Sequence, residues 1–330
     1  MKLKLYIFLI LNTGRFINKV YIEMSYMKSI LDKKCEAIFI KSIDPKEIAK
    51  KWKNNMEIEL DDEFKNLNSI DYFKCPNTGF SWYEPKEAAG SSNLYEQLEK
   101  FEWYYMREKW EFTMALNLIN QQSKILEVGA GGGHFLKLAV KKNHLAHGIE
   151  LNPKRAANMR SLGYEIKELT MNQLKKKTNE KYNVICAFQV LEHVSNPLEF
   201  ISDMISLLNQ GGKIIVSVPN AAVMKKIDPN NEDLLNQPPH HMGHWDKNVF
   251  YALEKLLPLK VKSFHYEPLA SYHITWMTTQ YLRNKILFMG KFFSRLLVNR
   301  YTTLPLQFLL HFGIKKYLPG HTLLVELETI

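Results

Sequence analysis

The chain has 330 residues, of which 46% are hydrophobic and 12% aromatic, enough for a large core and a smaller additional unit. Its charged fraction of 24% is ordinary and excludes disordered and fibrous classes. The net charge of +10 is scattered over short lysine runs without a recognised nucleic-acid module, so we expect no nucleic-acid partner.

The N-terminal residues and the cysteines bear on the cellular compartment. An apolar run at Leu5–Leu11 is short for a signal peptide and far below the roughly 20 residues that cross a bilayer. We interpret it as a strand, a weak anchor or an extension upstream of Met24 or Met27. Only three cysteines are present, which argues against a disulfide framework and favours a cytoplasmic protein.

The first 122 residues divide into two parts. Residues 1–92 form an N-terminal region of mixed character, with a charged, helix-like stretch at 45–55. Residues 93–122 are predicted to form a helix, because aromatic and aliphatic residues recur at helical spacing after a capping Ser92 or Asn93. Its aromatic side chains either pack in the core or form a lid over a cleft, with Tyr104 and Tyr105 nearest to the cleft.

Residues 93–270 are predicted to form the core, because apolar strands alternate with amphipathic helices from Lys124 onward. The short loops predict an α/β fold with a doubly wound, mostly parallel sheet covered on both faces. The expected helices are Pro153–Ser161 and Leu198–Leu208, the second ended by Gly211–Gly212. The expected strands are Lys124–Val128, Ala146–Ile149, Glu165–Lys167, Val184–Phe188, Lys213–Val218, Val261–Glu267 and Thr322–Glu328.

A glycine-rich turn follows the first of these strands, in the sequence KILEVGAGGGHF. Gly129, Gly131 and Gly133 let the backbone approach a ligand closely, and the start of the next helix offers N–H groups. A dinucleotide-binding turn needs a small residue where this chain has His134. The acid Glu127 before the turn is also more typical of a methyltransferase than of a dehydrogenase. The turn therefore predicts a nucleoside cofactor that is not a dinucleotide.

A second acid, Glu150, ends the next strand. Its carboxylate can accept hydrogen bonds from both hydroxyls of a ribose. The alternative is a carboxylate that caps the helix beginning at Pro153, a role that Asn152 fills better. We therefore expect Glu150 and the adjacent Leu151 to contact the cofactor.

Together with the passage Phe188–His193 and the sequence Gly211–Lys213, these residues resemble the successive motifs of class I S-adenosylmethionine (SAM)-dependent methyltransferases. The resemblance is closest to the branch of ubiquinone and sugar O-methyltransferases, and it covers roughly 95–260. It implies a seven-stranded Rossmann-like sheet and SAM as the methyl donor. It also implies main-chain contacts to the methionine end from Gly129, Ala130 and Gly131, and it places Gln189 in the cleft near the methyl group.

The contact to adenine departs from the family pattern. Family members often carry an Asp after the third strand, where this chain reads KELTMNQL. Either Glu168 or the backbone around Leu169–Thr170 takes that place.

Histidines are the candidates for the base that removes a proton from the acceptor, since SAM itself is already activated. His193 follows the fourth strand, where local packing explains it equally well. His240 and His241 lie in the sequence NQPPHHMGHWD, where the resemblance places an acceptor-facing loop. This loop can also be purely structural. We expect no metal there, because no carboxylate or thiolate is obviously arranged to complete four ligands.

The N-terminal region extends the resemblance, since related proteins often carry a zinc module with paired Cys-x-x-Cys knuckles there. This chain keeps only Cys35 and Cys75, with Ile38 and Thr78 in the partner positions. Two thiolates cannot make the usual closed tetrahedral site. We interpret residues 1–92 as a metal-free relic of a zinc-binding module.

Residues 271–330 are predicted to form a basic helical insertion followed by the last strand of the core. No acidic residue lies between Glu267 and Glu326, whereas lysines and arginines alternate with phenylalanines and leucines. Such a segment is typical of a peripheral membrane or protein contact, here through 271–318. The alternative is an insertion that packs on its own domain.

Two functions stay open at this point. An active methyltransferase would modify an oxygen or nitrogen of a small molecule, such as a sugar or an envelope precursor. The alternative is a non-catalytic SAM-fold binding module in a biosynthetic complex. The intact Glu127, glycine turn and Glu150 favour the enzyme.

Overall fold

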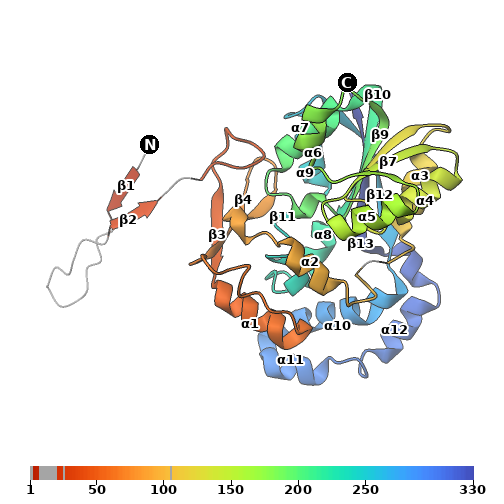
Figure 1. Cartoon of the computed structure of the whole chain (residues 1–330). Helices are drawn as coiled ribbons and strands as arrows, with labels where there is room; N and C mark the ends of the chain where they lie inside the picture. The colour runs from red at the N-terminus through yellow and green to blue at the C-terminus, as the bar shows by residue number, and fades with distance from the viewer. Residues whose placement is uncertain (1–2, 7–20, 25–26, 105) are drawn as a thin grey trace.

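A seven-stranded sheet organises most of the chain, of which the computed structural model describes residues 3–6, 21–24, 27–104 and 106–330 (Figure 1). The strand order is β12-β13-β10-β9-β6-β7-β8; β13 is antiparallel to both neighbours and the other pairs are parallel. The strands are β6 (Lys124–Val128), β7 (Leu145–Ile149), β8 (Glu165–Lys167), β9 (Tyr182–Phe188), β10 (Leu208–Pro219), β12 (Leu259–Pro268) and β13 (Pro319–Thr329). The predicted mostly parallel, doubly wound sheet is confirmed.

Helices cover both faces of this sheet, which explains why its central strands are apolar along their whole length. One face packs against α3 (Trp110–Leu118), α4 (His134–Lys141) and α5 (Pro153–Ser161). The other face packs against α6 (Met171–Lys177), α7 (Pro197–Ser206) and α9 (Lys247–Leu253). The carboxyl ends of β6, β7 and β9 therefore meet at one edge, between the two helical layers.

Two expected elements are wrong in detail. The helix expected over 93–122 is divided into α2 (Ser92–Leu98), capped by Ser91, and α3. The residues between them, including Trp103 and Tyr104, line a cavity instead of continuing the helix. Gly211 and Gly212 do not end α7, which stops at Ser206; they lie within β10, where its pairing with β9 is irregular.

A second sheet of four strands joins the N-terminal region to a loop of the core. Its order is β11-β5-β4-β3, and β11 comes from the segment that follows the histidine pair. The elements are β3 (Ile38–Ile43), α1 (Pro45–Met56), β4 (Ile70–Lys74), β5 (Ser81–Glu84), η1 (Lys86–Ala88) and β11 (Gly243–His244). Gly243 pairs with Trp82, and a Cβ on Gly243 would lie 2.7 Å from the ring of Phe80. The N-terminal region therefore supports the histidine loop directly.

The N-terminal thiols lie inside this region. Cys35 and Cys75 are buried and free, and the Thr78 hydroxyl accepts a hydrogen bond from the backbone N–H of Phe80 at 3.2 Å. The relic of a zinc module remains a prediction. Of the N-terminal apolar run, Leu5 and Tyr6 belong to β1 (Leu3–Tyr6), which pairs with β2 (Tyr21–Met24); its remaining residues lie outside the described part of the chain, as does Tyr105.

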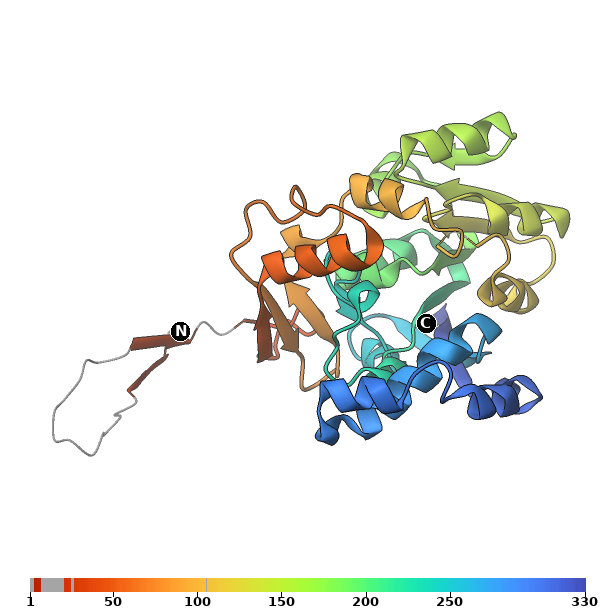
Figure 2. The same ribbon diagram turned by 90° about the horizontal axis from the view of Figure 1, so that it is seen from below.

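The segment between β12 and β13 is helical and lies on the lower side of the molecule in Figure 1, below α8 (Ala221–Ile227). The view from below shows its helices side by side along one edge (Figure 2). It consists of η4 (Ser271–His273), α10 (Ile274–Lys285), η5 (Leu287–Met289), α11 (Lys291–Leu297), α12 (Leu304–His311) and η6 (Ile314–Tyr317). Among the described residues, no helix is long and apolar enough to cross a bilayer.

Candidate active site

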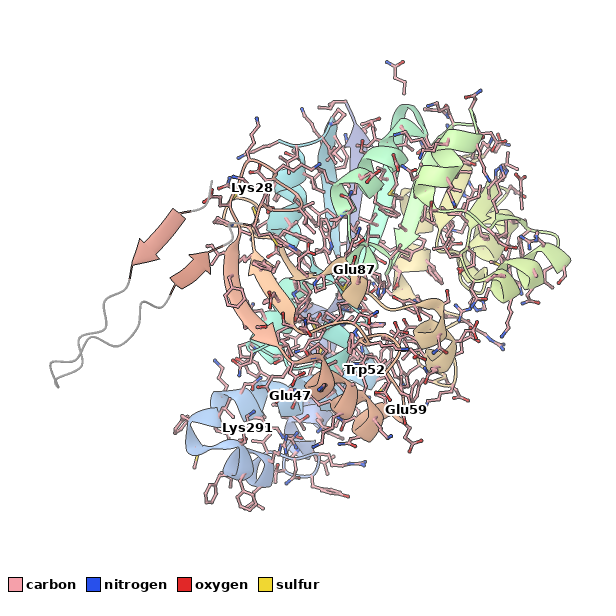
Figure 3. All side chains as sticks on the ribbon, turned by 60° about the vertical axis from the view of Figure 1, so that its left-hand side comes forward. Lys28, Glu47, Trp52, Glu59, Glu87 and Lys291 are labelled. Carbon is pink, nitrogen blue, oxygen red and sulfur yellow. The ribbon has the colours of Figure 1, made fainter. Side chains whose placement is uncertain are left out.

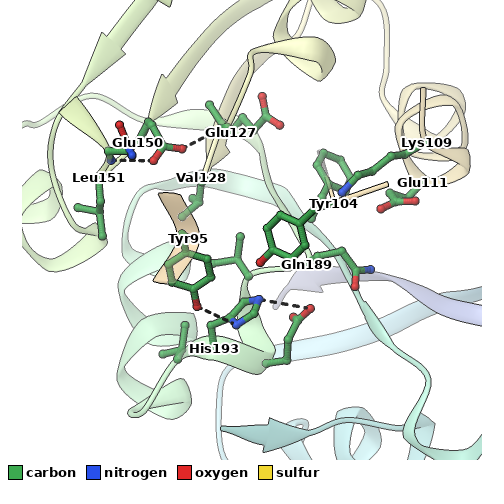
Figure 4. Close-up of a pocket in the computed structure, with 18 of the residues that line it drawn as sticks. Tyr95, Tyr104, Lys109, Glu111, Glu127, Val128, Glu150, Leu151, Gln189 and His193 are labelled. Atoms are coloured by element: carbon green, nitrogen blue, oxygen red, sulfur yellow. Dashed lines mark hydrogen bonds and ion pairs between the residues drawn. The ribbon is translucent and has the colours of Figure 1, made fainter. Parts of the chain in front are cut away.

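A cavity of about 1180 Å³ opens at the carboxyl ends of β6, β7 and β9 (Figure 4). Ligand sites of open α/β sheets lie at this edge. The volume exceeds the roughly 300–1,000 Å³ of a cavity for one drug-sized ligand, so it can hold a nucleoside cofactor and an acceptor together. The glycine turn and Glu150 lie on one side of the cavity, and the predicted histidines lie on the other.

The glycine turn after β6 requires glycine for steric reasons. Gly129 and Gly131 have φ values of 71° and 54°, and a Cβ on Gly129 would lie 2.8 Å from the side chain of Val190. The N–H groups of Gly129 and Ala130 both donate to the carbonyl of Ile149, at 2.9 and 3.0 Å. The turn therefore uses these two donors to fix its own shape, and the predicted main-chain contacts to a ligand would come from its other backbone groups.

Gly133 lies behind the turn and not among the residues that line the cavity. It precedes α4 with a φ of 71°, and a Cβ there would lie 2.9 Å from the sulfur of Met159. Its requirement for glycine comes from packing between α4 and α5 and from its backbone conformation. A direct contact from Gly133 to the cofactor is not what the geometry favours.

Glu127 is a buried carboxyl group at the base of the cavity. Its side chain is 3% exposed, and Oε2 has no hydrogen-bond partner among the described residues. Burial, followed by the charge of Glu150, raises the pKa of Glu127 well above its ordinary value. A positively charged ligand would supply the missing partner and stabilise the ionised form.

Glu150 lies at the end of β7 and holds the turn from the opposite side. Its Oε2 accepts from the N–H of Gly131 at 2.7 Å, and its Oε1 accepts from the N–H of Asn152 at 2.8 Å. Asn152 caps α5 by accepting from the N–H of Arg155 at 3.2 Å, which is the role predicted for it. Each oxygen of Glu150 keeps a second lone pair for a ligand hydroxyl. The neighbouring Leu151 exposes an apolar side chain in the same cavity.

Gln189 lies directly after β9 and also lines the cavity. Its φ is 54°, an unfavourable value for a residue with a side chain. Its N–H donates to the carbonyl of Ser217 at 2.9 Å, and its side-chain amide donates to the Ser217 hydroxyl at 3.3 Å. Neighbouring β10 therefore holds Gln189 in a strained conformation beside the cavity.

The structure separates the two candidates for the adenine contact. Glu168 forms an ion pair with Arg160 and does not line the cavity. Leu169 and Thr170 do line it, together with Asn172, which sequence reasoning missed. The geometry therefore favours the backbone alternative over the carboxylate of Glu168.

The interior of the cavity is acidic although the whole chain is basic. Buried Glu111, Glu192 and Glu267 line it in addition to Glu127 and Glu150. Burial raises the pKa of the first three, as it does that of Glu127. The lining also includes Lys109 and Arg155, and Arg155 is held by Glu99 through an Nε–Oε1 bond of 2.9 Å. A cationic ligand would favour the ionised form of these acids, which is the fit expected for the sulfonium and ammonium groups of SAM.

His193, His240 and His241 come together on the far side of the cavity. His193 belongs to η2 (Leu191–His193), and the other two follow η3 (Leu234–Asn236). The ring centroid of His193 lies 4.9 Å from that of His240 and 5.0 Å from that of His241. Two sequence segments that are far apart thus form one cluster. Figure 4 shows its His193 beside Tyr95.

Hydrogen bonds distinguish the three rings. Nδ1 of His193 lies against the backbone carbonyl of His240 and therefore carries the proton, which leaves Nε2 as an unprotonated acceptor. Nδ1 of His240 donates to the carbonyl of Leu235 at 2.8 Å, and its Nε2 accepts from the Tyr104 hydroxyl at 2.8 Å. His241 is the most enclosed of the three and faces Asn236 at 3.4 Å through Nδ1. His193 thus has the most available lone pair.

All three imidazoles are neutral in this environment. Burial lowers the pKa of His193 to about 4 and that of His240 to about 3. Burial and the neighbouring His240 lower the pKa of His241 well below its ordinary value. The three rings are therefore unprotonated at physiological pH, and each keeps one ring nitrogen with a lone pair.

Glu192 is the functional candidate that sequence reasoning missed, although it stands beside His193 in the motif. Its side chain is 1% exposed, and neither carboxylate oxygen has a hydrogen-bond partner among the described residues. Oε1 lies 4.0 Å from Nε2 of His193 and 4.0 Å from Nε2 of His241. Burial raises the pKa of Glu192 to about 8. The only sequence signal is its place in the Phe188–His193 passage.

The raised pKa of Glu192 predicts a pH-dependent cost to folding. The folded protein keeps this proton between the ordinary pKa of 4.5 and about 8, whereas the unfolded chain releases it. Stability contributed by this group is therefore lost as pH rises from 5 to 8. Between pH 5 and pH 8 the wild-type protein should lose on the order of 3 kcal/mol of unfolding free energy through this group, and Glu192→Gln should remove that loss. Urea unfolding at both pH values measures it. Parallel pH profiles for the two proteins would contradict the buried, protonated state.

The same cluster has the composition of a metal site. One ring nitrogen from each of His193, His240 and His241 lies within 4.8 Å of the others, and Glu192 is close. Neutral imidazoles with a held Nδ1–H are the form that binds divalent metals. However, the lone pair of His240 already accepts from Tyr104. Binding an ion through all three rings would require that bond to break.

Aromatic side chains complete the wall of the cavity. Trp103, Tyr104 and Trp110 line it, as the lid interpretation predicts, and Tyr95 of α2 joins them. The Tyr95 hydroxyl lies 3.1 Å from Nδ1 of His193. By contrast, His244 does not line the cavity; it bonds to the Tyr72 hydroxyl at 2.7 Å and to the carbonyl of Asn236 at 2.9 Å.

The sequence of this chain is similar to those of known methyltransferases. A family model described as a methyltransferase domain matches residues 99–285. The ubiquinone biosynthesis O-methyltransferase of Histophilus somni (strain 2336) is 26% identical over 166 residues, 47% of this chain and 66% of that protein. The enzyme of the same name from Aliivibrio fischeri (strain MJ11) is 26% identical over 163 residues, 44% of this chain and 69% of that protein. A solved SAM-dependent methyltransferase from Mesorhizobium loti gives a TM-score of 0.44 at 13% identity, covering 68% of this chain and 100% of that chain. The matches thus span about two thirds of the curated relatives' own length.

Proposed function

The chain belongs to the methyltransferase domain family, with SAM as its cofactor, and we propose that it methylates a hydroxyl oxygen of a small-molecule acceptor. The observation that carries this proposal is the shared cavity. Its acidic side, with Glu127 and Glu150, suits a cationic nucleoside cofactor, and its opposite side presents a neutral histidine, His193. The relatives named as O-methyltransferases support oxygen as the acceptor atom.

The cofactor would be held by the residues on the acidic side. Glu127 would accept from its ammonium group, the turn Gly129–Gly131 would contact it through main-chain carbonyl oxygens, and Glu150 would accept from its ribose hydroxyls. Leu151 would pack on its base. When bound, SAM supplies a methyl group already activated by the sulfonium charge.

The residues on the opposite side would prepare the acceptor. His193 would take the acceptor's proton at Nε2, while the carbonyl of His240 holds Nδ1–H and so fixes the tautomer. Glu192, at 4.0 Å, would stabilise the imidazolium once its own proton is lost. The ring-lined wall of Tyr95, Tyr104 and Trp110 would orient an aromatic or apolar acceptor and exclude water.

The proposal is tested first by calorimetric titration with SAM and by Glu150→Ala. We expect saturable binding of SAM and a loss of roughly 1–3 kcal/mol of binding free energy in the variant, because charge-assisted hydrogen bonds are removed. Glu168→Ala is the matched control, since this nearby acid is paired with Arg160 outside the cavity. It should leave affinity unchanged. If the protein does not bind SAM at high micromolar concentration, the proposed enzymatic activity is refuted. If Glu150→Ala and Glu168→Ala have equal effects, the proposed contact of Glu150 with the ribose is refuted.

Methyl transfer is tested by supplying labelled SAM with hydroxylated aromatic acceptors and with sugars. The expected result is transfer to a hydroxyl group that depends on Glu150. Transfer to an amine and to no hydroxyl would overturn the assignment of the acceptor atom.

A further inference from the structure

Two of the helices between β12 and β13, α11 and α12, bury polar side chains and expose apolar ones. The buried residue of α11 is Ser294, 3% exposed, and that of α12 is Gln307, 8% exposed. The outward side chains include Phe288 and Phe312, which are 86% and 75% exposed. Figure 3 shows side chains of this segment projecting away from the body of the protein around Lys291. The C-terminal apolar face is defined here by Phe288, Phe292, Phe293, Leu296, Phe308 and Phe312.

Hydrogen bonds hold the inner side of these helices in place. Oε1 of Gln307 accepts from the Thr275 hydroxyl at 2.8 Å, which joins α12 to α10. Nε2 of Gln307 donates to the Thr303 hydroxyl at 2.6 Å. The polar side is thus satisfied within the protein, and the apolar side is left for another environment. An insertion that only packed on its own domain would have the opposite pattern.

Every charged side chain that the segment itself places around the C-terminal apolar face is positive. No acidic residue occurs from 268 to 325. Exposed cations stand beside tyrosine rings: Lys285 over Tyr281 at 5.3 Å, Arg300 over Tyr301 at 5.5 Å and Lys316 over Tyr317 at 5.0 Å. Arg295 is exposed between Phe292 and Leu296. Lys291 pairs with Glu232 at 3.4 Å. Among the described residues, no other acid from outside the segment forms an ion pair with these cations.

We propose that the C-terminal apolar face docks onto the surface of a bilayer that contains anionic lipids. Such a surface offers negative headgroups to Arg295, Arg300 and Lys316 and an apolar interior to the phenylalanine side chains. Tyrosines with adjacent cations suit the boundary between the two. A second copy of the chain fits less well, because the same cations would face each other. Tyr272 and His273 of η4, at the start of the same segment, line the cavity of the candidate active site.

The test is sedimentation of the full chain with vesicles of phosphatidylcholine, with and without phosphatidylglycerol. We expect binding only to the vesicles that contain the anionic lipid, weakening with salt. Arg295→Gln with Arg300→Gln should weaken binding about 25-fold, since each cation near such a surface contributes about fivefold. Phe292→Ser with Phe308→Ser should weaken it at least ~10-fold through lost apolar insertion.

A matched control removes the same charge elsewhere. Lys176→Gln with Lys177→Gln changes two exposed lysines at the end of α6 and should leave binding within about twofold. SAM affinity, measured on every variant, should stay unchanged and so verifies the fold. The proposal is overturned if no vesicle binds, if the lysine control loses as much binding as the arginine variant, or if the phenylalanine variant only abolishes self-association in ultracentrifugation.

Discussion

His193→Asn is expected to lower kcat by about 10²–10⁴-fold, the usual contribution of a general base, while SAM affinity stays within about twofold. Asparagine keeps an N–H donor at the position of Nδ1, so the bond to the carbonyl of His240 can persist. It removes Nε2, which is the proton acceptor in the proposed reaction. Single-turnover methyl transfer combined with SAM calorimetry separates a loss of chemistry from a loss of binding.

The controls for this variant use the other histidines. His265→Asn changes a half-buried histidine of β12 that bonds to the Ser263 hydroxyl at 2.8 Å, and it should leave turnover unchanged. His241→Asn should have a smaller effect than His193→Asn, because His241 is more enclosed. A larger loss for His241 would reverse the assignment of the base.

The pH profile adds an independent readout. Since burial raises the pKa of Glu192 to about 8, its carboxylate forms only as pH approaches that value. Turnover of the wild-type protein should therefore rise up to about pH 8, because the carboxylate then stabilises the imidazolium of His193. Glu192→Gln should remove this rise of turnover with pH.

Local sequence patterns predicted the sheet well because each strand carries its own signal. Continuous apolar runs, such as Val184–Phe188, bounded by short loops give both the strand and its burial. The predicted boundaries of β6, β8 and α5 agree with the structure. The chain order of strands and helices then leaves few possible topologies.

The parts that were missed depend on contacts between distant segments. α2 and α3 are separate because the residues between them, including Trp103 and Tyr104, line the cavity. There the Tyr104 hydroxyl donates to His240, which lies 136 residues further along the chain. Gly133 looked like a ligand contact, but its constraint comes from Met159 in another helix. Glu192 had no distinguishing pattern, since its burial depends on the packing of the histidine loop. Spacing along the chain carries none of this information.

Glu127→Gln is expected to weaken SAM binding by about 10–150-fold at pH 8, which corresponds to the ~1.5–3 kcal/mol of a hydrogen bond to a charged group. Burial and the charge of Glu150 keep the pKa of Glu127 well above its ordinary value in the free protein. A cationic ligand lowers that pKa, so binding releases a proton below it. Wild-type affinity should therefore rise with pH, by up to about tenfold per unit, whereas the affinity of the variant should not.

This variant separates the ligand contact from the fold because glutamine resembles the protonated acid that the free protein already holds. Folding should therefore be retained, and titrations in buffers of different ionisation enthalpy should show proton release only for the wild type. Glu111→Gln is the matched control: it is another buried acid of the cavity whose pKa burial raises, but the charge that raises it further is Glu267, not Glu150. It should leave the proton release intact. Equal weakening by both variants would show that SAM responds to the general potential of the cavity and not to the carboxyl group beneath the glycine turn.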